Sequence, residues 1–292
     1  MRCFYPQHTK RDKEGNYKVY PCGRCLACRK NDATSWGIRS YFESLSHQYS
    51  TFLTVTYDDD HLLPSLSPRF AGSLSIPDHQ DFIKRLRYYC GTGVRFLVGA
   101  EYGDTTNRPH MHYLIFGVAM TDPIFYDAFY SSKKKGWIAR CKAWDKGECF
   151  IRPLDVGSCF YTSKYSLKYS KDDYVELKAV KQQLPFRLMS KHPGIGYEYF
   201  LKEKDRIMTD GFIRFKGSKI GIPRYFYDKA LPPGSKEREN YSYNRSLRFK
   251  AHNKDDFLLY SSSVGRGKPY LTWTELYNAL GDQQTLNMEK KV

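Results

Sequence analysis

Two segments rich in apolar, β-branched and aromatic residues lie close together in the chain, at 94–101 and 110–116. Only the loop 102–109, which contains Gly, Asp, Asn and Pro, separates them. Two strand-like segments joined by a short polar loop favour an antiparallel pair. The sequence therefore predicts an antiparallel sheet built around this pair.

Other segments indicate how the sheet is completed. Residues 51–57 alternate β-branched and aromatic side chains and run into three aspartates, which is typical of a strand, and a fourth strand is expected near 149–152. Apolar residues at helical spacing predict helices over 34–46, 76–89 and 156–170. This order is typical of an α+β fold, with an antiparallel sheet of about four to five strands covered by helices.

The charge balance favours a polyanion as partner. Lys and Arg number 47 against 31 Asp and Glu, giving a net charge of +16, and aromatic residues make up 16% of the chain. Positive charge attracts nucleic acid and aromatic rings stack on unpaired bases, so single-stranded nucleic acid fits both properties. A basic protein that is merely soluble is the alternative at this point.

Hydrophobic patterning excludes a membrane protein, because no apolar run approaches the roughly 18 residues that span a bilayer. The first residues also lack the apolar stretch of a secretory signal. We expect the protein to stay in the compartment where it is made. There its eight cysteines are expected to be reduced thiols or metal ligands.

His110 and His112 are separated by one residue within a predicted strand. Alternate side chains of a strand share a face, so both imidazoles are expected to point the same way, with Glu101 close enough on the neighbouring strand to add a carboxylate. Two imidazoles and a carboxylate suit Mg²⁺ or Mn²⁺ when phosphate oxygens and water complete the shell. The alternative is that these residues are ordinary polar residues of a strand.

A second group of candidate residues lies on the helix expected over 156–170. Tyr161 and Tyr165 are four residues apart, as are Lys164 and Lys168, so each pair forms a column on a helix. A tyrosine hydroxyl, whose pKa is about 10, needs a nearby cation or base to attack a phosphodiester, and a lysine one turn away supplies positive charge. We take all four as candidate catalytic residues. The alternative is an aromatic stripe facing the core.

The first residues contain a cluster of cysteines. Cys3, Cys22, Cys25 and Cys28 offer four soft ligands, enough for a closed tetrahedral Zn²⁺ site, with free thiols in a turn-rich subdomain as the alternative. In either case three nearby basic residues are candidate DNA contacts. These are Arg24, Arg29 and Lys30.

Three stretches resemble, in order and spacing, the motifs of His-hydrophobe-His rolling-circle replication initiators. They are residues 52–57, then Glu101 ahead of 108–116, and then 161–168. The chain is most similar to the initiators of gokushovirus-type microviruses, which also begin with a cysteine-rich segment like 21–29 and carry a later stretch like 189–196. The resemblance covers roughly residues 1–230. Arg108, at the start of the second motif, is a further candidate DNA contact.

The resemblance implies roles for the residues named above. Glu101, His110 and His112 bind the divalent ion, and Tyr161 and Tyr165 share the work of the nucleophile. The implied activity is a single-stranded-DNA endonuclease and strand transferase that starts rolling-circle replication of a small circular phage genome. A tyrosine attacks the scissile phosphate, a 5′-phosphotyrosine link forms, and the freed 3′-hydroxyl primes a polymerase before the strand is later rejoined.

The expected partners are single-stranded DNA at a replication origin and the helicase and polymerase of a bacterial host, in whose cytoplasm the protein would act. A host helicase is expected because the sequence has no Gly-x-x-x-x-Gly-Lys phosphate loop. We expect a cysteine-rich segment at 1–32, a His-hydrophobe-His endonuclease core at 33–180 and a basic, aromatic extension at 181–292. Two alternatives stay open: a plasmid initiator or transposase of the same fold, and a non-catalytic protein that binds or packages single-stranded DNA.

Overall fold

The computed structural model describes residues 3–10, 19–164, 169 and 171–252. By compactness the chain divides into two units. One is formed by residues 33–204, and the other by residues 1–32 together with 205–292. The larger unit carries the main sheet, and the smaller one carries the cysteine-rich segment.

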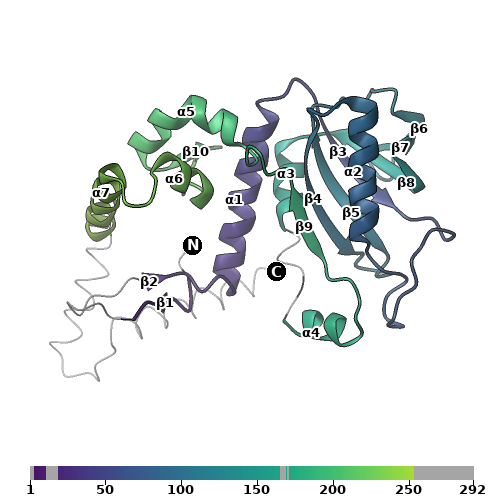
Figure 1. Cartoon of the computed structure of the whole chain (residues 1–292), viewed down its shortest axis with the longest axis horizontal. Coiled ribbons are helices and arrows are strands. Elements are labelled where there is room, and N and C mark those ends of the chain that lie inside the picture. The colour runs from purple at the N-terminus through teal and green to yellow at the C-terminus, as the bar shows by residue number, and fades with distance from the viewer. Residues whose placement is uncertain (1–2, 11–18, 165–168, 170, 253–292) are drawn as a thin grey trace. The chain divides into compact units, whose positions relative to one another are not determined.

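A seven-stranded antiparallel sheet forms the centre of the larger unit (Figure 1). Its strands lie in the order β6, β7, β8, β3, β5, β4, β9. In chain order these are β3 (Ser50–Thr56), β4 (Arg95–Tyr102), β5 (Pro109–Phe116), β6 (Phe125–Ser131), β7 (Gly136–Cys141), β8 (Trp144–Pro153) and β9 (Phe186–Met189).

The α+β class and the antiparallel pairing of 94–101 with 110–116 are confirmed, but the expectation of four to five strands is too low. The strands that the sequence did not indicate are β6, β7 and β9, at or next to the edges of the sheet. In β6 most side chains are exposed, and its pairing with β7 is irregular between Tyr126 and Phe129. Short or irregular edge strands carry little periodic signal, which is why the pattern missed them.

The described helices are α1 (Leu26–Ser44), α2 (Ile76–Cys90), α3 (Val156–Ser163), α4 (Lys171–Ala179), α5 (Tyr197–Asp210), α6 (Arg224–Ala230) and α7 (Lys236–His252). The helices expected over 34–46 and 76–89 are present, although α1 begins earlier, at Leu26. Ser75 caps α2, since its hydroxyl accepts the N–H of Asp78 at 3.1 Å. Within the part of the chain that the structure describes, no helix is both long and apolar enough to cross a bilayer.

The helix expected over 156–170 ends at Ser163 instead of Ser170. The Ser163 hydroxyl donates to the carbonyl of Cys159 at 2.7 Å. Ser and Thr compete in this way with the backbone of a helix and are weak helix formers, so the run Thr162–Ser163 favours an end. The expected helix is therefore too long by about two turns.

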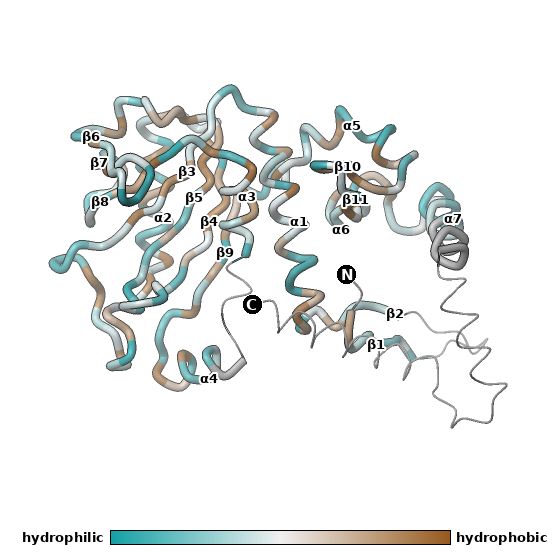
Figure 2. The backbone as a smooth tube through the Cα atoms, turned by 180° about the vertical axis from the view of Figure 1, so that it is seen from behind, coloured by the Kyte–Doolittle hydropathy of each residue, from teal (hydrophilic) through white to brown (hydrophobic). Residues whose placement is uncertain are grey.

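Each face of the sheet has its own buried cluster. On one face, α2 packs Phe82 and Leu86 against strand residues such as Leu53; α2 crosses in front of the sheet in Figure 1. On the other face, Phe52 and Leu114 pack with Cys159 of α3 and with partly buried side chains of α1. Figure 2 shows the apolar segments of β3, β4 and β5 in the middle of the sheet.

Gly37 allows α1 to approach α3 closely. A Cβ at this position would lie 2.6 Å from Cδ1 of Phe160, a separation that van der Waals contact does not permit. Only glycine leaves room for that ring. The close approach holds α3, and with it Tyr161, against the sheet.

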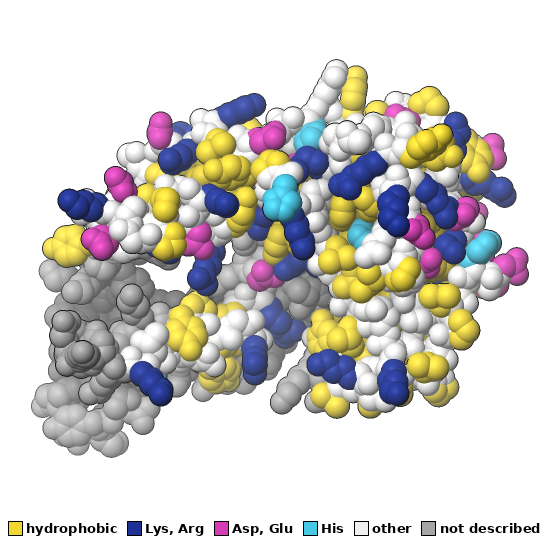
Figure 3. All heavy atoms as spheres, viewed as in Figure 1, with side chains coloured by type: hydrophobic (Ala, Val, Ile, Leu, Met, Phe, Trp, Pro, Cys, Tyr) yellow, Lys and Arg dark blue, Asp and Glu magenta, His cyan; other side chains and the backbone are white. Residues whose placement is uncertain are grey.

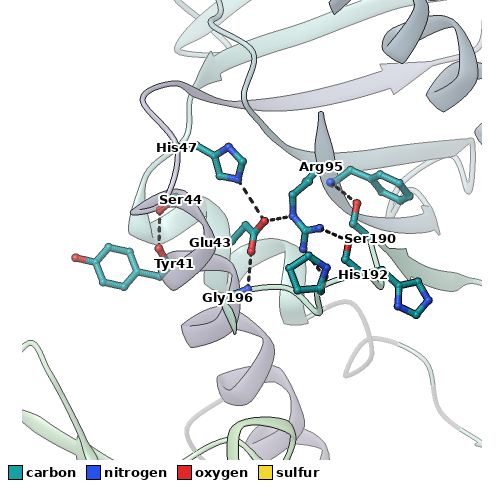
Figure 4. A network of polar contacts seen from close by, with 10 residues as sticks. Tyr41, Glu43, Ser44, His47, Arg95, Ser190, His192 and Gly196 are labelled. Carbon is teal, nitrogen blue, oxygen red and sulfur yellow. Dashed lines mark hydrogen bonds and ion pairs between the residues drawn. The ribbon is translucent and has the colours of Figure 1, made fainter. Parts of the chain in front are cut away.

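A buried ion pair ties the end of α1 to β4 (Figure 4). Glu43 accepts hydrogen bonds from Arg95, from His47 at 3.3 Å and from the N–H of Gly196 at 2.6 Å. Arg95 also donates to carbonyl groups of the segment 192–196. Burial opposes ionisation of Glu43, but these hydrogen bonds outweigh it and lower its pKa. The network fixes the chain beyond β9 on the larger unit.

The smaller unit contains two short antiparallel pairs. β1 (Gln7–His8) pairs with β2 (Val19–Tyr20), and β10 (Ile213–Phe215) pairs with β11 (Ser218–Ile220). Arg238 of α7 binds Asp228 of α6 at 2.9 Å and lies over the ring of Tyr227 at 4.8 Å. These contacts join α6 and α7.

Candidate metal and nucleophile site

The pairing of β4 with β5 brings Glu101, His110 and His112 together. Glu101 lies opposite His110, and Gly99 lies opposite His112, so the three side chains share one face of the sheet. Gly99 carries no side chain, which leaves space beside His112. The predicted juxtaposition of two histidines with a carboxylate is present in the structure.

The three side chains converge on one oxygen. Glu101 Oε1 lies 3.0 Å from His110 Nε2 and 3.4 Å from His112 Nε2. Neighbouring ligands of an octahedral ion with bonds of about 2.1 Å are about 3 Å apart, so a small divalent cation fits this separation with little movement. The three side chains are mostly buried, with exposed fractions of 4% for Glu101, 19% for His110 and 8% for His112. The nitrogen and oxygen donors suit Mg²⁺ or Mn²⁺.

The second nitrogen of each imidazole is held by the protein. His110 Nδ1 lies 3.1 Å from the carbonyl oxygen of Arg108, which can only accept, so Nδ1 carries the proton. His112 Nδ1 lies 2.7 Å from the hydroxyl of Thr54 on β3. Metal-binding histidines are usually oriented in this way, with Nδ1 bonded to the protein and Nε2 available to the ion.

Tyr161 of α3 is the tyrosine that the structure places beside these histidines. Its ring centroid lies 5.6 Å from that of His112 and 6.3 Å from that of Phe52. The side chain is 48% exposed, so the ring is packed but accessible. Asp155 fixes the start of α3, because its carboxylate accepts the N–H of Ser158 at 2.6 Å.

The remaining residues of the tyrosine motif are placed less closely. Lys164 is the exposed C-cap of α3. Tyr165 and Lys168 lie outside the described residues, so their predicted roles stay predictions. Tyr169 is buried, and its hydroxyl accepts the N–H of Tyr102 at 2.8 Å and donates to the Tyr102 carbonyl at 3.2 Å. These bonds give Tyr169 a structural role in holding the end of β4.

An open cavity of about 570 Å³ surrounds the histidines and Tyr161. It contains several side chains that sequence reasoning did not assign to the site. Arg152 of β8 is one: its guanidinium carbon lies 4.6 Å from the centre of the Phe52 ring, and its buried Nε has no hydrogen-bond partner among the described residues. The lining residues are Phe52, Thr54, Thr56, His110, His112, Lys134, Phe150, Arg152 and Tyr161.

Pairing is the signal that could have found some of these residues. Thr54 lies opposite both His112 and Phe150, and Phe52 lies opposite Arg152. The alternation of residues 51–57 already placed Phe52, Thr54 and Thr56 on one face. The register between β3 and β8 could not be read from the sequence, since their separation along the chain is large.

Arg108 lies at a neighbouring cavity of about 500 Å³ at the end of β3. Its guanidinium donates to the carbonyl of Tyr57 at 2.8 Å and pairs with Asp59 at 2.7 Å. Arg140 and Tyr126 line the same cavity. Arg108 therefore ties the loop before β5 to the end of β3.

The four cysteines of the first segment form a compact cluster. Their sulfur atoms all lie within 4.8 Å of one another, with Cys22 to Cys28 at 4.0 Å and Cys3 to Cys25 at 3.9 Å. A tetrahedral Zn²⁺ site with Zn–S bonds of about 2.3 Å has sulfur atoms about 3.8 Å apart. The cluster therefore fits a zinc ion with small adjustments.

Backbone N–H groups point at these sulfur atoms. Cys22 N donates to Cys3 Sγ at 3.2 Å, and the N–H groups of Arg24 and Cys25 donate to Cys22 Sγ at 3.4 Å. Burial disfavours a thiolate at Cys22, but these two bonds outweigh it and lower its pKa to about 6. The surroundings therefore stabilise a thiolate, the form that binds metal.

The basic residues near this cluster lie at or just before the first turns of α1. Arg24 is exposed, whereas Arg29 and Lys30 are partly buried. In the larger unit, Figure 3 shows Lys and Arg side chains beside exposed hydrophobic ones on the visible face.

Comparison with known proteins identifies the family. A family model of the replication-associated protein ORF2 matches residues 50–173, which include β3, β4, β5 and α3. The replication-associated protein ORF2 of Spiroplasma virus 4 is 30% identical over 291 residues, covering 94% of this chain and 84% of the relative. The chain belongs to the replication-associated protein ORF2 family.

Two further relatives support this membership. The replication-associated protein VP4 of Bdellovibrio phage phiMH2K is 30% identical over 233 residues, covering 72% of this chain and 67% of the relative. The replication-associated protein ORF4 of Chlamydia phage 1 is 26% identical over 246 residues, covering 78% and 58%. The relationship to microvirus replication proteins expected from the three motifs is confirmed. No solved structure matches the chain.

Proposed function

We propose that this protein nicks single-stranded DNA at a phage replication origin by tyrosine attack and later rejoins the strand. The observation that carries the proposal is the position of Tyr161, whose ring lies 5.6 Å from that of His112 beside the Glu101, His110 and His112 cluster. A nucleophile next to a donor set for a divalent ion is the arrangement that metal-assisted phosphodiester cleavage requires.

Glu101, His110 and His112 would hold the ion. When bound, Mg²⁺ or Mn²⁺ polarises a phosphodiester and neutralises its charge. The protein would contribute the rest from its own side chains. Lys134 and Arg152 bring positive charge to the same cavity, and Phe52 packs against Tyr161 and His112 and so limits how far the nucleophile can move.

The reaction would proceed at phosphorus without ATP. The Tyr161 hydroxyl loses its proton and its oxygen forms a bond to phosphorus, while the bond from phosphorus to the 3′-oxygen breaks. The products are a 5′-phosphotyrosine and a free 3′-hydroxyl that primes a host polymerase. Lys164 and Lys168 are the proposed sources of positive charge near the hydroxyl, and Tyr165 is the proposed second nucleophile that resolves the link after a round of synthesis.

The remaining expectations complete the proposal. Cys3, Cys22, Cys25 and Cys28 would hold a structural Zn²⁺, supported by the spacing of the sulfur atoms. Arg24, Arg29, Lys30 and Arg108 would contact DNA. A host helicase would open the duplex, and the protein would act in the cytoplasm of a bacterial host, consistent with relatives named after viruses of bacteria.

A gel assay tests the central proposal. The purified full chain is incubated with Mn²⁺ and a labelled single-stranded hairpin oligonucleotide from its cognate origin, and the products are separated under denaturing conditions. The expected result is a covalent protein–DNA adduct and a shortened fragment with a 3′-hydroxyl. Binding without any adduct or cleavage, with either Mg²⁺ or Mn²⁺, would instead support a non-catalytic single-strand-binding protein.

A further inference from the structure

A row of side chains runs from the histidine cluster to the outer edge of the sheet. Strand pairing places His112 opposite Thr54, Thr54 opposite Phe150, Phe150 opposite Ile138, and Ile138 opposite Phe129. Directly opposite residues of antiparallel strands share a face, so the row lies on the face that carries the cluster. At about 4.8 Å between neighbouring strands, His112 and Phe129 are about 19 Å apart.

The outer end of this row is exposed. Phe129 is 56% exposed on the edge strand β6, and Ile138 on β7 is partly buried. Phe150 lines the cavity around the histidines, and its ring lies over Gly136, where a Cβ would come within 2.4 Å of it. The row is therefore an apolar track that begins in the cavity and ends on an accessible aromatic ring.

Positive charge accompanies this track. The turn between β6 and β7 carries Lys133, Lys134 and Lys135, all exposed, and Lys134 lines the cavity. Arg152, two residues from Phe150 on β8, adds a second cation on the same face. Aromatic rings that stack on bases, beside cations that contact phosphates, are the combination that binds single-stranded DNA.

We infer that the DNA strand leaving the nick site follows this row, with a base stacked on Phe129 and backbone phosphates held by Lys134 and Arg152. The inference rests on the proposed function, because it takes the cavity as the place of the scissile phosphate. It assigns the hairpin formed by β6 and β7 a binding role. The charge of the hairpin turn and its continuity with the cavity select a polyanionic strand as the occupant.

Lysines at a sheet edge have a second use, because they discourage edge-to-edge pairing of sheets. That role would make substitution of the lysines promote aggregation, and it would leave DNA affinity unaffected by Phe129. The two roles therefore predict different results for the same variants.

Phe129→Ala and Tyr130→Ala form a matched pair that tests the inference. The two residues are adjacent on β6 and equally exposed, at 56%, but Tyr130 pairs with Trp137 on the opposite face. Binding of the full chain to fluorescent single-stranded oligonucleotides is measured by anisotropy in the absence of divalent ions. We expect Phe129→Ala to weaken binding of a long strand about five-fold or more, with no loss for Tyr130→Ala.

Two additional readouts sharpen the test. Lys134→Gln should reduce the salt dependence of binding by about 0.7 in the logarithmic slope, the value for one phosphate contact. A photo-crosslinking phenylalanine analogue at position 129 should label the oligonucleotide, and the same analogue at 130 should not. Equal effects at 129 and 130, in both affinity and crosslinking, would overturn the inference.

Failure of the inference and failure of the proposed function give different patterns. A chain that nicks DNA but binds it equally well with and without Phe129 keeps the nuclease and loses the track. A chain that forms no adduct but shows the Phe129 effect keeps the binding row and loses the nuclease. Because binding is measured without divalent ions, it does not depend on cleavage.

Discussion

Thr54 Oγ1 lies 2.7 Å from His112 Nδ1, and both residues are buried. When Nδ1 donates to the threonine oxygen, the lone pair of Nε2 faces Glu101, which is the tautomer that binds a metal ion. The threonine on β3 therefore orients a ligand on β5. The contact connects the pairing of two strands to the chemistry of the site.

Thr54→Val should weaken the affinity for Mn²⁺ by about 10- to 100-fold, because valine keeps the shape of threonine but removes the partner of Nδ1. Titration calorimetry of the full chain measures this directly. Thr51→Val is the control: Thr51 lies on the same strand, and its buried hydroxyl donates to the carbonyl of Val118 at 2.8 Å, away from the ions. Equal losses for the two variants would contradict the role of Thr54.

Tyr161→Phe and Tyr165→Phe separate one nucleophile from two. If the tyrosines alternate, each single variant should still form an adduct, which mass spectrometry should locate on the remaining tyrosine, while the double variant should form none. Tyr169→Phe is the control, since its hydroxyl is engaged with Tyr102, and it should keep the adduct. An inert Tyr161→Phe beside an active Tyr165→Phe would reduce the scheme to a single nucleophile.

The cysteine cluster should hold about one zinc ion per chain by elemental analysis. This content should survive replacement of His110 and His112 by Ala and be lost in a Cys22→Ser, Cys25→Ser variant. Cys90→Ser, which changes a cysteine outside the cluster, should retain the metal. Protein that is purified without chelator and contains no zinc would refute the assignment.

His79 should make the fold sensitive to mild acid. Its side chain is buried, and burial lowers its pKa from 6.5 to about 4. Between these values the unfolded chain takes up a proton that the folded chain does not, so stability is complete above pH 6.5 and falls as the pH approaches 4. One histidine with this shift contributes about 3 kcal/mol.

The measurement is urea unfolding of the wild type and of His79→Gln at several pH values across this window. Glutamine keeps a polar partner for the hydroxyl of Tyr113, which lies 3.0 Å from His79 Nδ1, but does not titrate. The free energy of unfolding of the variant should therefore decrease less on acidification. Parallel pH profiles for the two proteins would show that another group is responsible.

The central part of the fold could be predicted from the sequence, because its strands are buried and periodic. The loop 102–109 was enough to pair β4 with β5, and that pairing was enough to bring Glu101 to the histidines. The outer strands could not be predicted in the same way, since β6 is exposed and irregular. Arg152 and Phe150 were missed for the same reason: their place in the site depends on the register between β3 and β8.

The tyrosine motif shows a different limit. Tyr161 was placed correctly on a helix, because the sequence from Val156 onward supports one. The extension of that helix to Ser170 was wrong, since spacing alone does not reveal that Ser163 bonds to the backbone of Cys159. A pattern of residues four apart is therefore informative only as far as the helix continues.

The register of β4 against β5 sets where the length of this chain could vary. Gly103 N donates to the carbonyl of Arg108 at 2.9 Å and closes the loop between them, so residues added inside the loop would leave the ladder of hydrogen bonds unchanged. One residue added between His110 and His112 would instead turn one imidazole to the opposite face of the sheet. Insertions a few positions apart would thus have opposite consequences: one lengthens a surface loop, and the other dismantles the donor set.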